Sequence, residues 1–86
     1  MTKELRGFIN RVRKAQDRIF NNKKYDRLAM SISMSNRGFC DVSAYLHDEV
    51  LPDVIDSYHM KIKPWSTAEE IEEDIKKLSQ VVGFDI

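Results

Sequence analysis

The chain has 86 residues, of which 42% are hydrophobic and 33% are charged. This length allows one hydrophobic core, so we expect a single domain over residues 1–86. Its apolar runs are far shorter than the roughly twenty residues of a membrane-spanning helix, and the first residues lack the apolar stretch of a secretory signal. The 14 basic and 14 acidic side chains sum to a formal charge of zero, which argues against a strongly basic nucleic-acid binder and a strongly acidic protein.

The first predicted element is a helix over about residues 2–22. Thr2 is its expected N-cap, and the polar stretch that follows residue 20 marks its end. The helix shows the i, i+3, i+4, i+7 spacing of one buried face, with Ala15 and Gln16 filling a gap in the apolar series. The apolar residues assigned to that face are Leu5, Phe8, Ile9, Val12, Ile19 and Phe20.

A period of two begins at Leu28 and predicts a half-buried strand. Residues 35–39 are then typical of a hairpin with a three-residue loop, in which Gly38 takes the left-handed conformation. A two-residue loop would place the apolar partners on opposite faces of the sheet. The three-residue loop instead pairs Leu28 with Leu46, Met30 with Ala44, Ile32 with Val42 and Met34 with Cys40.

A third strand is predicted over about residues 54–63, and Pro64 ends it because proline cannot continue the ladder. Asp56 breaks the alternation and is expected near the sheet edge. The connection over residues 48–53 is expected to be a loop or an extension of the hairpin. The inward residues of the strand are Val54, Tyr58, Met60 and Ile62, and the outward ones are Ser57, His59, Lys61 and Lys63.

The last predicted element is a helix from Ser66 or Thr67 to about Val82. Ser66 with Glu69, or Thr67 with Glu70, forms a capping box. Gly83 is the expected C-terminal stop, after which Phe84 and Ile86 are expected to fold back on the core. The buried stripe comprises Ala68, Ile71, Ile75, Leu78 and Val82, and the exposed face carries the i, i+4 pairs Glu72–Lys76 and Glu73–Lys77.

These elements predict an α+β two-layer sandwich, in the order helix, three-stranded antiparallel meander, helix, with both helices on one sheet face. The order resembles that of the double-stranded-RNA-binding domain, and the resemblance stops at topology. That family has a lysine-rich start to its last helix, whereas residues 67–74 here contain five acids that would repel phosphate. The family's function is therefore not expected for this chain.

No catalytic set is predicted. Cys40 faces the core while His47 and His59 project from the opposite face, so no thiolate–imidazole pair can form. Asp41 lies across from His59 in one strand register, which makes at most a surface pair. The densest group of potential ligands is His47, Asp48, Glu49 and Asp53, but its spacing fits no metal site, and we expect no metal and no cofactor. The single cysteine favours a reducing, cytoplasmic compartment.

The zero net charge separates into two halves along the chain. Residues 1–27 hold nine basic and three acidic side chains, which gives +6, and residues 28–86 hold five basic and eleven acidic ones, which gives −6. Arg11, Lys14 and Arg18 form a stripe on the first helix, opposite its core face. The two halves either lie side by side and neutralise each other or present two separate patches.

We therefore expect a small non-enzymatic protein-interaction or adaptor module that binds an unidentified protein or a second copy of itself, with no membrane contact. The alternative is a nucleic-acid-binding accessory protein that uses the basic first helix or the polar outer face of the sheet. An ordinary solvated sheet face is favoured over a stacking platform, because only one or two aromatic residues are available there. The candidate binding residues are Arg11, Lys14, Arg18, Tyr45, His47, His59 and Lys61.

Overall fold

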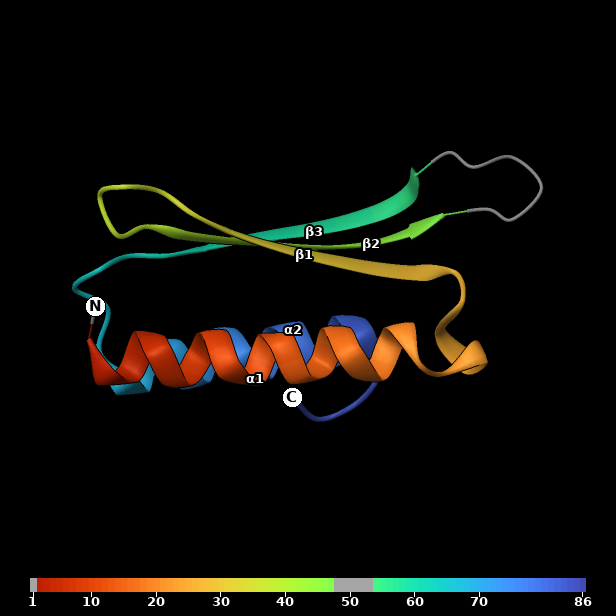
Figure 1. Cartoon of the computed structure of the whole chain (residues 1–86), viewed down its shortest axis with the longest axis horizontal. Coiled ribbons are helices and arrows are strands. Elements are labelled where there is room, and N and C mark those ends of the chain that lie inside the picture. The colour runs from red at the N-terminus through yellow and green to blue at the C-terminus, as the bar shows by residue number, and fades with distance from the viewer. Residues whose placement is uncertain (1, 48–53) are drawn as a thin grey trace.

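The computed structural model describes residues 2–47 and 54–86, and the side chains of these residues except Val54 and Ile55. The elements are helix α1 (Lys3–Phe20), a 3-10 turn η1 (Lys23–Tyr25), strands β1 (Leu28–Met34), β2 (Cys40–His47) and β3 (Val54–Ile62), and helix α2 (Ala68–Val82). Figure 1 shows α1 and α2 side by side beneath one face of the sheet, which confirms the predicted α+β fold.

Helix α1 forms as the sequence predicts, with one exception at its last residue. The Thr2 hydroxyl accepts a hydrogen bond from the Leu5 N–H and so caps the helix. Phe20, which was assigned to the buried face, is 89% exposed, so that assignment is wrong. Each residue of a helix turns the chain by about 100°, and the turn after the buried Ile19 carries Phe20 away from the sheet.

The hairpin between β1 and β2 has the predicted register, from Leu28 opposite Leu46 to Met34 opposite Cys40. Ser35 N–H donates to the Phe39 carbonyl at 2.8 Å and closes a three-residue loop in which Gly38 has a φ of 89°. Glycine adopts this left-handed conformation without the steric cost that a Cβ would bring. The pleat therefore turns the apolar residues of both strands to the helix side, although Met34 and Leu46, at the two ends of the ladder, remain 41% and 39% exposed.

Strand β2 is the central strand of the sheet, with β1 on one side and β3 on the other. The ladder between β2 and β3 contains a bulge between Leu46 and His47, and Asp56 lies opposite Leu46 beside it. Asp56 keeps the inward parity of Tyr58 and Met60, and it is exposed because it lies at the end of the sheet, as the sequence predicts. The predictions for residues 48–53 and for the inward direction of Val54 lie outside the described part of the chain.

Helix α2 begins with the predicted capping box, in which Thr67 and Glu70 exchange side-chain and main-chain hydrogen bonds. It ends at Gly83, whose φ is 86°. The ion pairs within 4 Å among the described residues are Arg11–Glu72 and Lys61–Asp41. The predicted pairs Glu72–Lys76 and Glu73–Lys77 are therefore not formed. Glu72 therefore bridges to α1 instead of pairing along its own helix.

The core lies between the two layers and draws side chains from every long element. Phe84 and Ile86, beyond α2, are partly buried against it, as the sequence predicts. Neither α1 nor α2 is both long enough and apolar enough to cross a bilayer. The most deeply buried side chains are Leu5, Phe8, Val12, Cys40, Val42, Ile62 and Leu78.

Candidate functional site

The outer face of the sheet is the side turned away from the two helices, and no helix or strand of the described chain covers it (Figure 1). On β2 the residues alternate, so Cys40, Val42 and Ala44 are buried while Asp41, Ser43 and Tyr45 point outward. Phe39, directly before β2, continues the outward series. Because side chains alternate between the two faces of a strand, Phe39, Asp41, Ser43 and Tyr45 lie together on the open face of the sheet.

An aromatic pair stands at the hairpin end of this face. The rings of Phe39 and Trp65 meet edge to face, with centroids 5.5 Å apart and planes at 84°. The ammonium of Lys61 lies 5.8 Å from the Phe39 centroid, and that of Lys63 lies 5.9 Å from the Trp65 centroid. We call these four residues, Phe39, Lys61, Lys63 and Trp65, the aromatic corner. Trp65 is 67% exposed, so the corner presents a large ring and two cations to solvent.

A tight turn after β3 positions Trp65. Lys63 N–H donates to the Ser66 hydroxyl at 3.1 Å, and Ser66 N–H donates to the Lys63 carbonyl at 3.0 Å. Pro64 ends the strand because it has no N–H for the ladder. The turn therefore holds the tryptophan against the hairpin instead of letting the chain pass directly into α2.

Further along the outer face, the Ser43 hydroxyl and His59 Nδ1 share a hydrogen bond of 2.8 Å. The register that would place Asp41 across from His59 is not the one adopted. Asp41 faces Lys61, with 3.8 Å between Oδ1 and Nζ, and Ser43 faces His59. A serine hydrogen-bonded to a histidine supplies two members of a catalytic triad. Among the described residues, however, no carboxylate hydrogen-bonds to the ring, so the third member, which would orient the histidine as a base, is missing.

Tyr45 and His47 occupy the far end of β2, and both are half-buried. Tyr45 lies opposite Ser57, and His47 follows the bulge. The His47 main chain is tied to the segment that precedes β1, because its N–H donates to the Arg27 carbonyl at 3.0 Å. The structure therefore brings the predicted site residues Tyr45, His59 and Lys61 onto one face, with His47 at its margin.

Cys40 lies on the opposite side of the same strand and is completely buried. Burial, with a smaller contribution from the Asp41 carboxylate, raises the pKa of its thiol from 9.0 to about 11. The thiolate needed for nucleophilic or metal chemistry is therefore disfavoured. In the described ranges, 2–47 and 54–86, no group of three or more His, Cys, Asp or Glu side chains is arranged to hold a metal ion.

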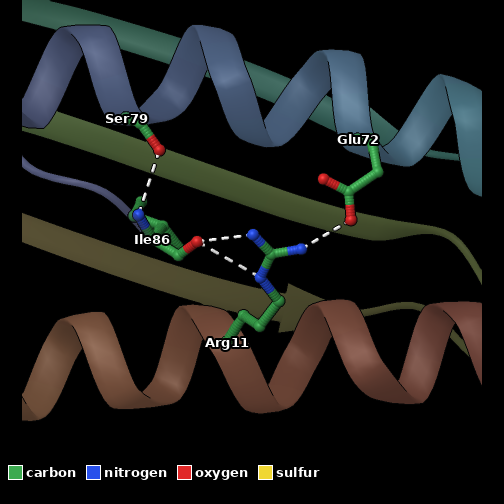
Figure 2. A network of polar contacts seen from close by, with 4 residues as sticks. All are labelled: Arg11, Glu72, Ser79 and Ile86. Carbon is green, nitrogen blue, oxygen red and sulfur yellow. Dashed lines mark hydrogen bonds and ion pairs between the residues drawn. The ribbon is translucent and has the colours of Figure 1, made fainter.

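The predicted basic stripe on α1 contacts the C-terminal segment. Figure 2 shows the Arg11 guanidinium between Glu72 of α2 and the main chain of Ile86. Arg11 Nη1 donates to Glu72 Oε1 at 2.6 Å, and its Nη2 and Nε donate to the Ile86 carbonyl at 2.6 and 3.2 Å. The Ile86 N–H donates to the Ser79 hydroxyl at 3.1 Å, which fixes the segment to α2. Arg11 thus links α1 and α2 to the C-terminal residues 84–86, which we call the tail.

Arg18 completes this arrangement. Its guanidinium carbon lies 4.3 Å from the Phe84 ring centroid, and the Phe84 ring lies 5.0 Å from that of Tyr25. Lys14, between the two arginines, is exposed and makes no hydrogen bond or ion pair with the described residues. We call the connected set the tail clasp; it comprises Arg11, Arg18, Tyr25, Glu72, Ser79, Phe84 and Ile86.

An open groove of about 790 Å³ runs beside the tail clasp, between α2 and the tail. Its lining mixes the cations Arg11 and Lys76 with the carboxylates Glu72, Glu73 and Asp85. Because charges of both signs are interspersed, the groove selects neither anions nor cations. It is therefore a weaker candidate than the outer face.

The sequence pattern places Lys63 and Phe39 on the outer face but not among the candidate binding residues, and it gives no position for Trp65. The one signal in the sequence is that Trp65 directly follows Pro64, which places it just beyond the end of the strand. The contact itself joins residues 39 and 65, which are far apart in the sequence, and alternation within a strand contains no information about such a contact. No protein-family model, curated protein or solved structure matches this chain.

Proposed function

We propose that this protein is a small non-enzymatic interaction module and that its partner docks on the outer face of the sheet. The observation that carries the proposal is the exposure of Trp65 in the aromatic corner, where its ring rests on Phe39 without being buried by the fold. Exposed tryptophan and tyrosine residues are enriched among the side chains that dominate binding free energy in interfaces. The fold gains little from this exposed ring, whereas a partner that covers it would gain a large contact area.

The chemistry of the reactive groups supports a non-enzymatic role. Cys40 is buried with a raised thiol pKa, and the imidazole of His59 is held by a serine in open solvent. Catalytic pairs usually lie in a cleft that excludes water and holds donors for the developing charge. The outer face offers stacking and hydrogen bonding, which are binding contacts.

Two partner classes fit this surface. A protein, including a second copy of the chain, would use the aromatic anchors or pair with β1 or β3, the outer strands of the sheet within the described residues. Nucleic acid is favoured by a different observation, the two lysine ammonium groups beside the rings of Phe39 and Trp65.

Photo-crosslinking from two positions tests the docking surface. A photoreactive phenylalanine analogue replaces Trp65 in one protein and Phe20 in the other, because both are exposed aromatic residues on different surfaces. In the native cell we expect adducts of defined mass from position 65 at several times the yield from position 20. Equal yields, or adducts from position 20 alone, would contradict docking on the outer face. A catalytic turnover that is lost in His59→Ala would contradict the non-enzymatic role.

A further inference from the structure

We infer that the outer face of the sheet binds single-stranded nucleic acid, with aromatic rings as the stacking surface and lysines as the phosphate contacts. The inference rests on the proposed function, since it names the partner of the same surface. The rings belong to Phe39, Tyr45, His59 and Trp65, and the cations are Lys61 and Lys63.

The rings follow the length of the central strand. Phe39 and Tyr45 both point outward along β2, and six residues of strand separate them by roughly 20 Å. His59 faces Ser43 between them, and Trp65 extends the series beyond Phe39. Single-stranded bases stack on Phe, Tyr, Trp and His side chains of such sheets. The structure therefore adds Trp65 to the rings of Phe39, Tyr45 and His59, which sheet parity places on the same face.

The charges of this face suit a polyanion although the whole chain is neutral. Lys61 and Lys63 project on the ring side, and the single acid among the outward residues of β2 and β3, within the described chain, is Asp41, which lies 3.8 Å from Lys61. The acids of α2 lie in the helix layer, on the other side of the sheet (Figure 1). An ammonium beside each ring of the corner can contact the phosphate of a stacked nucleotide.

The rest of the face argues for a nucleic acid over a protein. Between the rings it carries the small hydroxyl side chains of Ser31, Ser33, Ser43 and Ser57. A protein interface of ordinary size buries an apolar centre, and these serines offer none. Their hydroxyl groups can instead donate to or accept from sugars, phosphates and base edges. Single strands are favoured over duplexes because only unpaired bases present their faces to the rings.

The fluorescence of Trp65 gives a direct test, because it is the only tryptophan in the chain. The probe is a fluorescein-labelled oligopyrimidine RNA of about twelve nucleotides, within the range of single-strand site sizes. Titrated at low salt, it is expected to quench the tryptophan emission with the same Kd that its anisotropy gives. Trp65→Ala is expected to raise the anisotropy Kd about tenfold, the usual effect of losing one stacked base.

Matched variants separate stacking from charge. Phe20→Ala removes an exposed ring elsewhere and is expected to leave the Kd unchanged, while Trp65→Phe restores most of the affinity lost in Trp65→Ala. Each phosphate contact to a single strand contributes about 0.7 to the slope of log Kd against log salt. Lys61→Ala with Lys63→Ala is therefore expected to lower that slope by about 1.4. Lys76→Ala with Lys77→Ala, on α2, is expected to leave the slope unchanged.

Three outcomes would overturn the inference. They are the absence of quenching and anisotropy change at low salt, a Kd that Trp65→Ala does not alter, and tighter binding of a duplex of the same sequence. A glutamate-rich peptide that quenches Trp65 where the RNA does not would point to an acidic protein partner, and the proposed function would stand without the inference. Equal crosslinking from positions 65 and 20 would remove the proposed function itself. Circular dichroism of each variant confirms that the fold is intact.

Discussion

The tail clasp and the aromatic corner each contain a basic side chain beside an aromatic ring. They differ in whether other residues of the chain cover that ring. In the tail clasp, Arg18 lies over Phe84, and the tail segment that carries this ring is hydrogen-bonded by Arg11 and by Ser79. In the aromatic corner, Lys63 lies beside Trp65, and two thirds of the tryptophan remains exposed. One cluster is closed by the protein's own chain, and the other is open.

The same difference shows which basic groups of the chain remain accessible and which are engaged within the fold. The basic first segment and the acidic remainder do lie side by side where Arg11 meets Glu72, so part of the +6 and −6 division is neutralised within the fold. Within the stripe, Arg11 is held by Glu72 and Ile86 and Arg18 lies over Phe84, although guanidinium groups are the usual choice for recognition of anions. The lysines of the outer face keep their charges accessible.

The largest expected difference between the tail clasp and the aromatic corner is in the free energy of unfolding after truncation of Phe84 or Trp65. Phe84→Ala is expected to lower the free energy of unfolding by about 2–3 kcal/mol, because a partly buried ring packed on Tyr25 is lost. Trp65→Ala is expected to change it by less than about 0.5 kcal/mol, as for other exposed positions. Urea denaturation followed by circular dichroism measures both. Similar losses in the two variants would show that the corner is also part of the stabilising core.

The next largest expected effect is the pH dependence of stability that arises from the buried thiol of Cys40. Because burial raises the pKa of Cys40 to about 11, the folded state retains the proton that the unfolded chain loses near pH 9. The stabilisation is complete below about pH 9 and is lost as the pH rises toward 11, by up to about 2 kcal/mol. Urea denaturation at several pH values, compared between the natural chain and Cys40→Ala, isolates this group from lysines and tyrosines that titrate in both proteins.

Thiol accessibility gives an independent measurement of the same burial. Cys40 is expected to react with a thiol reagent at pH 8 only after denaturation, since it is fully covered in the folded chain. Rapid labelling of the native protein would mean that the sheet does not separate the outer face from the core.

The smallest effect concerns the stripe on α1. Arg11→Ala is expected to cost about 1–2 kcal/mol, because charge-assisted hydrogen bonds to Ile86 and Glu72 are removed from a half-exposed site. Lys14→Ala, three residues further along the helix, is expected to cost less than about 0.5 kcal/mol. Thermal unfolding of the two single variants at equal ionic strength makes the comparison. Equal costs would indicate that the guanidinium contacts contribute nothing measurable.

The local patterns predicted the fold because each element is determined by neighbours in sequence. The alternation from Leu28 to Leu46 defines the hairpin register, and the Thr67 and Glu70 pair defines the start of α2. These features require only a period, a cap or a turn residue, and the structure confirms them.

The candidate site was harder to predict because it depends on contacts between distant segments. The β2–β3 register, which gives His59 a serine and gives Lys61 an aspartate, follows a connection that the sequence pattern does not constrain. The Phe39–Trp65 contact also requires the turn at Lys63–Ser66. Phe20 was misassigned because an apolar residue at a helix end has no further turn to show which face it occupies.

Gly38 connects the hairpin to the proposed binding surface. A methyl group added there would come within 3.1 Å of Pro64 Cβ, and its backbone would be forced to hold a φ of 89° with a side chain. Pro64 directly precedes Trp65, so a side chain at position 38 that displaced Pro64 would also be expected to shift the tryptophan relative to Phe39. A substitution at Gly38, which has no side chain of its own, is thus expected to disturb the aromatic corner through Pro64.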